Sequence, residues 1–129
     1  MSRATILCVD DDPAVGKVLS ALLVQADFEA VLAASGKVAL DLLERRAIDL
    51  VVSDLRMPGL GGKELLGTVR ERWPDVPVVL LTAHGTVPLA VEAMRAGAAD
   101  FLLKPFDRDE VLFVLKKALA ASRAGESPR

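Results

Sequence analysis

Three carboxyl-bearing residues stand where two apolar runs of the chain end. Asp10 and Asp11 follow the run at residues 5–9, and Asp54 follows the run at residues 48–53. If these runs are neighbouring parallel strands, the three carboxylates meet at one edge of a sheet. Such a concentration of negative charge costs free energy unless a cation compensates it. The pattern therefore predicts a divalent-metal site suited to phosphoryl chemistry.

Two further polar residues follow apolar runs in the same way. Thr82 comes after residues 78–81, and Lys104 after residues 101–103. One Mg²⁺ and the Lys104 ammonium would neutralise the three carboxylates, and Mg²⁺ prefers oxygen ligands. A carboxylate beside Mg²⁺ can act as a nucleophile and form an aspartyl phosphate. Lys104 and the Thr82 hydroxyl could then each hold a phosphoryl oxygen, and no pocket for an organic substrate is evident.

The elements that must position these residues alternate regularly. Helix-start signals at Pro13, Gly36, Gly62, Thr86 and Asp107 each follow a short apolar run. Five such strand–helix units predict a parallel sheet with helices on both faces. Sites in open sheets of this type lie outside the carboxyl ends of the strands. The expected strands span residues 4–9, 29–33, 48–53, 78–81 and 101–103.

Apolar residues at helical spacing predict the buried side of each helix. We expect the fourth helix to use an alanine and valine stripe for core packing. The stripe of the first helix is Val15, Val18, Leu19, Leu22, Leu23 and Ala26, and that of the fourth is Val87, Ala90, Val91 and Met94. Gly97 is a natural stop for the fourth helix.

Length and charge limit the classes of protein. The 129 residues suit one domain, and the net charge of -2 gives no electrostatic case for binding nucleic acid or a membrane. The single cysteine, Cys8, sits in a strand pattern and is expected to be a buried structural thiol. No signal-peptide pattern or membrane-length apolar stretch is present, so we expect a cytoplasmic protein. Residues 1–120 are predicted to form the domain and residues 121–129 a flexible tail or linker.

Four stretches together resemble a bacterial response-regulator receiver domain. The resemblance runs from residue 4 to about residue 120. It implies a flavodoxin-like (βα)5 fold with the sheet order 2-1-3-4-5. The stretches are Cys8-Val9-Asp10-Asp11-Asp12-Pro13, Asp54-Leu55-Arg56-Met57-Pro58-Gly59, Leu81-Thr82-Ala83-His84-Gly85 and Lys104-Pro105-Phe106.

The resemblance implies a role for each residue of the acidic site. Asp54 matches the phospho-acceptor, Asp11 the direct ligand of Mg²⁺, and Asp10 the acidic partner that acts through water. The backbone carbonyl of Arg56 matches the third protein ligand. By the same resemblance, Arg56 and His84 are candidates for tuning the lifetime of the phosphate.

The resemblance also implies a switch. Thr82 matches the switch hydroxyl, Lys104 the phosphate-binding lysine, and Phe101 the switch aromatic, while the bond before Pro105 is expected to be cis. Position 101 often carries a tyrosine in the family, so burial of the phenylalanine ring would have to act without a hydroxyl. The loop at residues 82–85 and Phe101 are similar to those of receivers joined to ATPase-type transcription activators.

The resulting hypothesis is a signalling domain that assists only its own phosphorylation and dephosphorylation. The implied donor is a sensor histidine kinase or a histidine phosphotransfer protein. The face of the fourth helix, fifth strand and fifth helix would then change its preference for a downstream effector or a second copy. A stand-alone receiver and the front of a longer regulator both fit the sequence.

Three other classes remain open on the sequence. A Mg²⁺-dependent aspartyl-nucleophile phosphatase would release phosphate from small substrates. A flavin-binding module would need a phosphate-cradling loop after the first strand, where this chain has Asp10, Asp11 and Asp12. A degenerate receiver would keep the fold and accept no phosphate.

Overall fold

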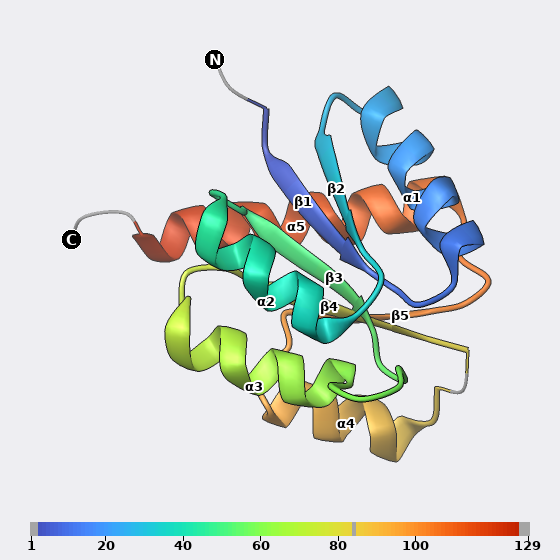
Figure 1. Ribbon diagram of the computed structural model, residues 1–129, viewed down its shortest axis with the longest axis vertical. Helices are drawn as coiled ribbons and strands as arrows, with labels where there is room; N and C mark the ends of the chain where they lie inside the picture. The colour runs from blue at the N-terminus through green and yellow to red at the C-terminus, as the bar shows by residue number, and fades with distance from the viewer. Residues whose placement is uncertain (1–2, 84, 127–129) are drawn as a thin grey trace.

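The structure is a computed structural model that describes residues 3–83 and 85–126. Its centre is a five-stranded parallel sheet in the order β2-β1-β3-β4-β5 (Figure 1). The strands are β1 (Thr5–Val9), β2 (Glu29–Ala33), β3 (Leu50–Asp54), β4 (Val78–Thr82) and β5 (Asp100–Leu103). Strands β1, β3 and β4 are buried along their whole length, which explains why they read as unbroken apolar runs. The expected fold and strand order are confirmed.

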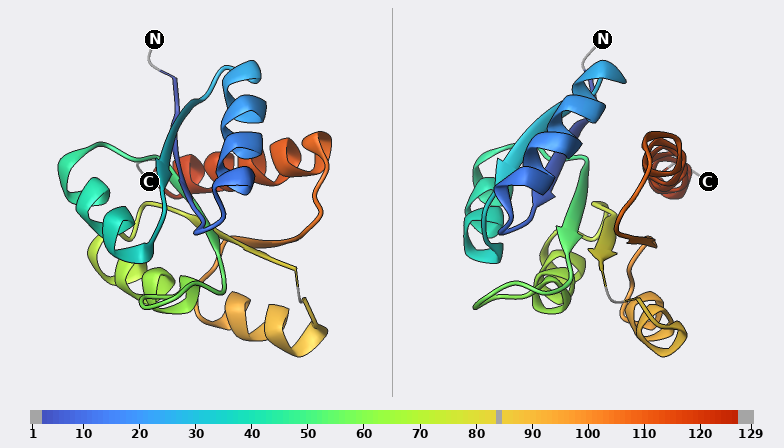
Figure 2. Two further views of the ribbon diagram at one scale, coloured as in Figure 1. Left: turned by 45° about the vertical axis from the view of Figure 1, so that its right-hand side comes forward. Right: turned by 90° about the vertical axis from the view of Figure 1, so that its right-hand side faces the viewer.

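Five helices cover the two faces of the sheet (Figure 2). Helices α1 and α5 enclose one apolar core with Ile6 and Cys8, and helices α2, α3 and α4 contribute to the other core with Leu7 and Val9. The alternation along β1 divides its side chains between the two cores because successive residues point to opposite faces. The helices are α1 (Pro13–Gln25), α2 (Gly36–Arg45), α3 (Gly62–Arg72), α4 (Val87–Arg95) and α5 (Arg108–Glu126).

Side-chain caps fix where most of the helices begin. The carboxylate of Asp12 accepts a hydrogen bond from the Ala14 amide, and the Thr86 hydroxyl accepts one from Leu89. Ser35 and Asp107 accept equivalent bonds at α2 and α5. Each cap satisfies an amide that has no partner within its helix, so the predicted helix starts are confirmed.

The end of α4 is set by Gly97, as predicted. Its φ of 102° lies in the left-handed region, where a residue without a Cβ is favoured. The Ala98 amide reaches back to the Ala93 carbonyl at 3.1 Å, and the Gly97 amide to Met94 at 3.1 Å. These two bonds form a Schellman motif that closes the helix.

The predicted buried stripe of α4 is wrong. Val87 is 78% exposed, and Val91 and Met94 are also exposed. The side of the helix that faces the protein carries the smaller Ala93, with Leu89 and Ala90 partly buried. Helix α4 lies over β5 at the edge of the sheet, so one side packs and the more apolar side faces solvent. On α1, Val18 is likewise exposed, contrary to the prediction.

The expected domain boundary at residue 120 falls inside α5. The helix continues to Glu126. The Ser122 hydroxyl donates a hydrogen bond of 2.7 Å to the Asp75 carbonyl in the connection between α3 and β4. This bond holds the helix beyond residue 120 against the domain, while residues 127–129 lie outside the described part. In the described chain, no helix is both long and apolar enough to cross a membrane.

Candidate functional site

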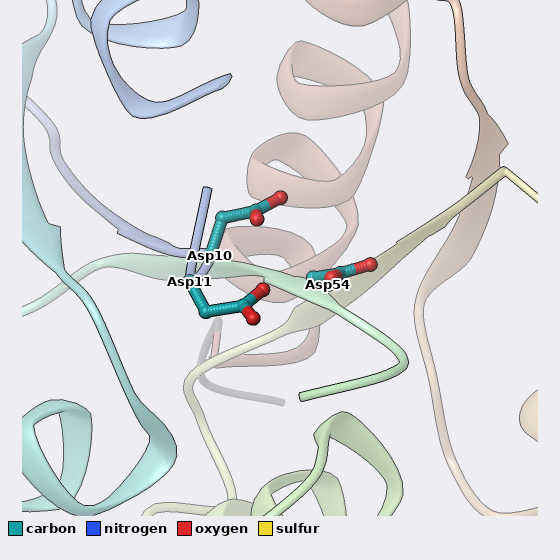
Figure 3. A group of neighbouring side chains, drawn as sticks. All are labelled: Asp10, Asp11 and Asp54. Carbon is teal, nitrogen blue, oxygen red and sulfur yellow. The ribbon is translucent and has the colours of Figure 1, made fainter. Parts of the chain in front are cut away.

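The three predicted carboxylates converge at the carboxyl edge of the sheet (Figure 3). Asp54 is the last residue of β3, and Asp10 and Asp11 follow the end of the neighbouring β1. Each offers a carboxylate oxygen, and these oxygens all lie within 4.8 Å of one another. Asp10 and Asp54 are buried, whereas Asp11 is exposed. The site is therefore walled by the sheet and open on one side.

Lys104 is the cation that faces this cluster. Its Nζ lies 2.9 Å from Asp10 Oδ2 and 3.4 Å from Asp54 Oδ1. Lys104 follows the edge strand β5, and its amide donates to the Thr82 carbonyl at 2.8 Å. The Lys104–Pro105 peptide bond is cis, as expected. The lysine therefore bridges two carboxylates and is nearer to Asp10.

Both carboxylate oxygens of Asp10 are already engaged. Oδ2 accepts from Lys104, and Oδ1 accepts a 2.9 Å hydrogen bond from the Asp12 amide. The second bond orients the turn that leads into α1. Asp12 itself serves as the cap of α1 and is not part of the carboxylate cluster.

The charges of the cluster shift the proton affinities of its members. Burial raises the pKa of Asp54, and the negative charge of Asp10 raises it further. Lys104 and a hydrogen bond from the Arg56 backbone act in the opposite direction but do not outweigh these effects. Burial acts to lower the pKa of Lys104, but its hydrogen bond to Asp10 and the two carboxylate charges raise the pKa overall. The site without a further cation is thus short of positive charge.

The donor set fits a small hard dication. Carboxylate oxygens are the ligands that Mg²⁺ prefers, and it needs only one or two of them from the protein. Three carboxylates face one ammonium group, so a bound dication would relieve the repulsion that raises the pKa of Asp54. Among the described residues, Asp10, Asp11 and Asp54 are the group that could hold it.

The other predicted residues lie on the elements that surround the cluster. Thr82 ends β4 and is 1% exposed, and Phe101 on β5 is half-buried against the core beneath α3 and α4. Arg56 is exposed in the loop after β3, with its amide near Asp54. His84, predicted to tune phosphate lifetime, lies outside the described residues.

Two glycines are needed to build the site, and sequence reasoning treated them only as helix-start signals. A Cβ on Gly62 would lie 2.3 Å from the Asp54 carbonyl, so α3 can begin beside the end of β3 only with a glycine there. A Cβ on Gly36 would lie 2.6 Å from the Leu60 carbonyl in the same loop. The Gly61–Gly62 pair was the available signal, because adjacent glycines often mark close backbone approach.

The fold and the carboxylate cluster define a receiver type of signalling domain, and comparison with known proteins agrees. Residues 6–116 match the family model for the response regulator receiver domain. The chain belongs to this family of two-component signalling domains. The family is a class of signalling domains and not of conventional enzymes.

Known relatives and structures lie close to this chain. Response regulator protein FleR of Pseudomonas aeruginosa is 49% identical over 109 residues, covering 84% of this chain and 23% of the relative. DNA-binding transcriptional regulator NtrC of Klebsiella pneumoniae is 37% identical over 129 residues, covering 100% of this chain and 28% of the relative. The crystal structure of a CheY-like receiver domain protein from Methanospirillum hungatei JF-1 superposes with a TM-score of 0.90 at 26% sequence identity. The match covers 96% of this chain and 99% of that protein's chain. The chain thus spans 23% and 28% of the length of these two curated regulators.

Proposed function

We propose that this domain accepts a phosphoryl group on Asp54 in a Mg²⁺-dependent reaction and acts as a switch. The observation that carries the proposal is the meeting of Asp10, Asp11 and Asp54 with Lys104 at one edge of the sheet. Such a set contains a nucleophile, ligands for a cation, and a positive charge for a phosphoryl oxygen. These are the parts that phosphoryl transfer to a carboxylate requires.

In the proposed reaction, a carboxylate oxygen of Asp54 attacks the phosphorus of a phosphohistidine on a donor protein. An O–P bond forms as the P–N bond breaks, and the electron pair of that bond remains on the imidazole nitrogen. Lys104, 3.4 Å from Asp54, would exchange its bond to the carboxylate for one to a phosphoryl oxygen. Bound Mg²⁺, held by Asp11, Asp54 and the Arg56 carbonyl with Asp10 acting through water, would offset the negative charge of the transferred group.

The proposed switch follows from the change of charge at Asp54. Phosphorylation adds negative charge and acceptor oxygens, so the Thr82 hydroxyl would move toward the phosphate and Phe101 into the space it leaves. Ligand-dependent change of this kind is a shift between two populations. The surface that would report it spans α4, β5 and α5 and carries the exposed apolar residues Val87, Val91, Met94, Leu103 and Phe113.

The proposed partners come from the same reading. The donor is a sensor histidine kinase or a histidine phosphotransfer protein, and the output is a downstream effector protein or domain. Of the matched regulators, NtrC is named as a DNA-binding transcriptional regulator, and this chain covers only 28% of it. We therefore propose that residues 1–120, with the further turns of α5, act as the receiver unit of such a regulator. A second copy that binds to the α4–β5–α5 surface after phosphorylation is part of the same proposal.

Intact-mass spectrometry after incubation with acetyl phosphate tests the acceptor. The wild-type protein should gain one phosphoryl adduct with Mg²⁺ and none with excess chelator, while Asp54→Ala should gain none under either condition. An adduct that persists in Asp54→Ala would mean that another residue is the nucleophile. The absence of any adduct on the wild type, even with a phosphorylated donor protein, would favour a degenerate receiver. The decay rate of the adduct in Arg56 and His84 variants would test their predicted effect on phosphate lifetime.

A further inference from the structure

The start of α2 lies against the backbone of the loop that follows β3. A Cβ on Gly36, the first residue of α2, would lie 2.6 Å from the Leu60 carbonyl oxygen and 3.0 Å from Leu60 Cβ. The φ of Gly36 is not in the left-handed region, so its backbone conformation does not itself require glycine. A backbone oxygen cannot turn aside as the end of a flexible side chain can. A side chain at residue 36 would therefore displace either α2 or the loop.

Helix α2 is anchored more firmly than the loop. Ala39 and Leu43, on the buried side of the helix, are 0% and 4% exposed and belong to the apolar core. In the loop, by contrast, Arg56 and Gly59 are exposed. Exposed backbone with few buried contacts is the part of a structure that moves most easily. A methyl group on Gly36 would therefore displace the loop and not the helix.

The same loop closes on itself beside Asp54. The Gly62 amide donates a 3.1 Å hydrogen bond to the Leu55 carbonyl, which ties the end of the loop to its start. Next to Leu55, the Arg56 amide donates a hydrogen bond to the Asp54 carboxylate. Because the loop is short and its two ends are held together, a displacement at Leu60 changes the course of the backbone at Arg56.

We propose that Gly36 is a positioning residue for the cation site. Because it has no side chain, Leu60 can rest against the start of α2, and this contact keeps the Arg56 backbone beside Asp54. The inference rests on the proposed function, in which the Arg56 carbonyl and the Asp54 carboxylate both hold Mg²⁺. It adds a residue of another helix that is not itself a ligand and acts only through the loop.

The substitution Gly36→Ala tests the proposal through the affinity for Mg²⁺, measured by titration of amide resonances. The affinity should fall by about tenfold to a hundredfold, which is typical when a group that orients a metal ligand is lost. Gly16→Ala is the matched control, because Gly16 is also a buried helical glycine, but its Cβ would make only an ordinary contact of 3.6 Å with Leu32. This control should bind Mg²⁺ as the wild type does. Wild-type affinity in Gly36→Ala would overturn the proposal, because the contact at Leu60 would then have no effect on the site.

Two further variants separate positioning from damage and identify the contact. Leu43→Val removes part of a buried side chain from the same helix, so it should lower the free energy of unfolding without weakening Mg²⁺ binding. An equal loss of affinity in Leu43→Val would contradict the proposal, because affinity would then follow stability. Gly36→Ala/Leu60→Ala keeps the Leu60 carbonyl and should bind Mg²⁺ as weakly as Gly36→Ala. Wild-type affinity in this double variant would also contradict it, because the contact would then lie in the leucine side chain and not in the loop backbone.

A second readout separates this inference from the proposed function. In metal-free protein, the amide resonance of Arg56 should shift in Gly36→Ala and not in Gly16→Ala. If the wild type binds no Mg²⁺, the proposed function fails, while this resonance still decides whether Gly36 positions the loop. An unmoved Arg56 resonance would refute the positioning role whatever the protein binds.

Discussion

Replacing Asp54 by asparagine should stabilise the protein when no metal is present. The change keeps the shape of the side chain and removes one of three clustered negative charges. The repulsion of the Asp54 carboxylate by Asp10 and Asp11 and its attraction to Lys104 disappear together. The sign of the effect depends on which of these contributions is larger.

The distances give the magnitude. For an effective dielectric constant between about 80 and about 20, one carboxylate pair at 4.8 Å repels by about 0.9 to 3.5 kcal/mol. The attraction between Lys104 and Asp54 at 3.4 Å is about 1.2 to 4.9 kcal/mol on the same basis. Two repulsions exceed one attraction, so Asp54→Asn should raise the free energy of unfolding by about 0.5 to 2 kcal/mol. The desolvation of Asp54 adds to this in the same direction.

The pH dependence has a definite sign. The pKa of Asp54 is raised in the folded protein, first by burial and then by Asp10. A proton on Asp54 therefore stabilises the folded protein fully at pH values below the pKa that Asp54 has in the unfolded chain. This stabilisation is lost as the pH rises through the pKa that Asp54 has in the folded protein. The advantage of Asp54→Asn should therefore be absent in acid and appear as the pH rises through this window toward neutrality.

Urea unfolding followed by far-ultraviolet circular dichroism, with chelator present, measures the effect. Asp75→Asn, at an exposed carboxyl near the opposite end of the sheet, is the matched control and should change little. Added Mg²⁺ should stabilise the wild type by mass action and the variant less. An Asp54→Asn protein that is less stable than wild type without metal would refute the reasoning, because Lys104 would then dominate the site.

Three further predictions concern stability and access. Burial raises the pKa of the Cys8 thiol to about 12, so a disulfide reagent at pH 8 should label it only as fast as the protein unfolds; rapid labelling without denaturant would contradict its burial. Ser122→Ala should lower the free energy of unfolding by about 0.5 to 1.5 kcal/mol and speed amide hydrogen exchange in the last turns of α5, because the hydrogen bond to the Asp75 carbonyl is lost. Unchanged exchange rates would mean that these turns do not contribute to the stability of the domain. Gly61→Ser should raise the free energy of unfolding by about 0.5 to 1 kcal/mol, because the start of α3 lacks a side-chain cap and the φ of Gly61, -81°, suits any residue. A lower stability in urea unfolding would mean that Glu64 Oε1, which would lie 2.8 Å from the new Cβ, does not move aside.

Much of this fold is encoded in short-range patterns. Apolar runs identified every strand, and the caps Asp12 and Thr86 identified helix starts, because both signals act within a few residues. The carboxyl ends of parallel strands share one edge, so the sequence alone places Asp10 and Asp54 together.

The errors arose where tertiary contacts decide. The spacing of Val87 and Val91 identifies an apolar side of α4, but periodicity does not reveal whether anything covers it. Burial of α4 depends on its position at the sheet edge, which leaves only the side with Ala93 packed. The extension of α5 beyond residue 120 depends on Ser122 meeting Asp75, a contact that no local pattern encodes.

The bond between Lys104 and Asp10 also has a consequence for synthesis of the chain. It joins residues 94 positions apart, so the site closes only after β5 has joined a sheet begun by β1. A nascent chain that has emerged as far as residue 100 already carries all three carboxylates but lacks their cation. Such an intermediate would have self-repelling acids at an unfinished edge of the sheet. The full arrangement of the three carboxylates with Lys104 would therefore arise in one step, near the end of translation of the domain.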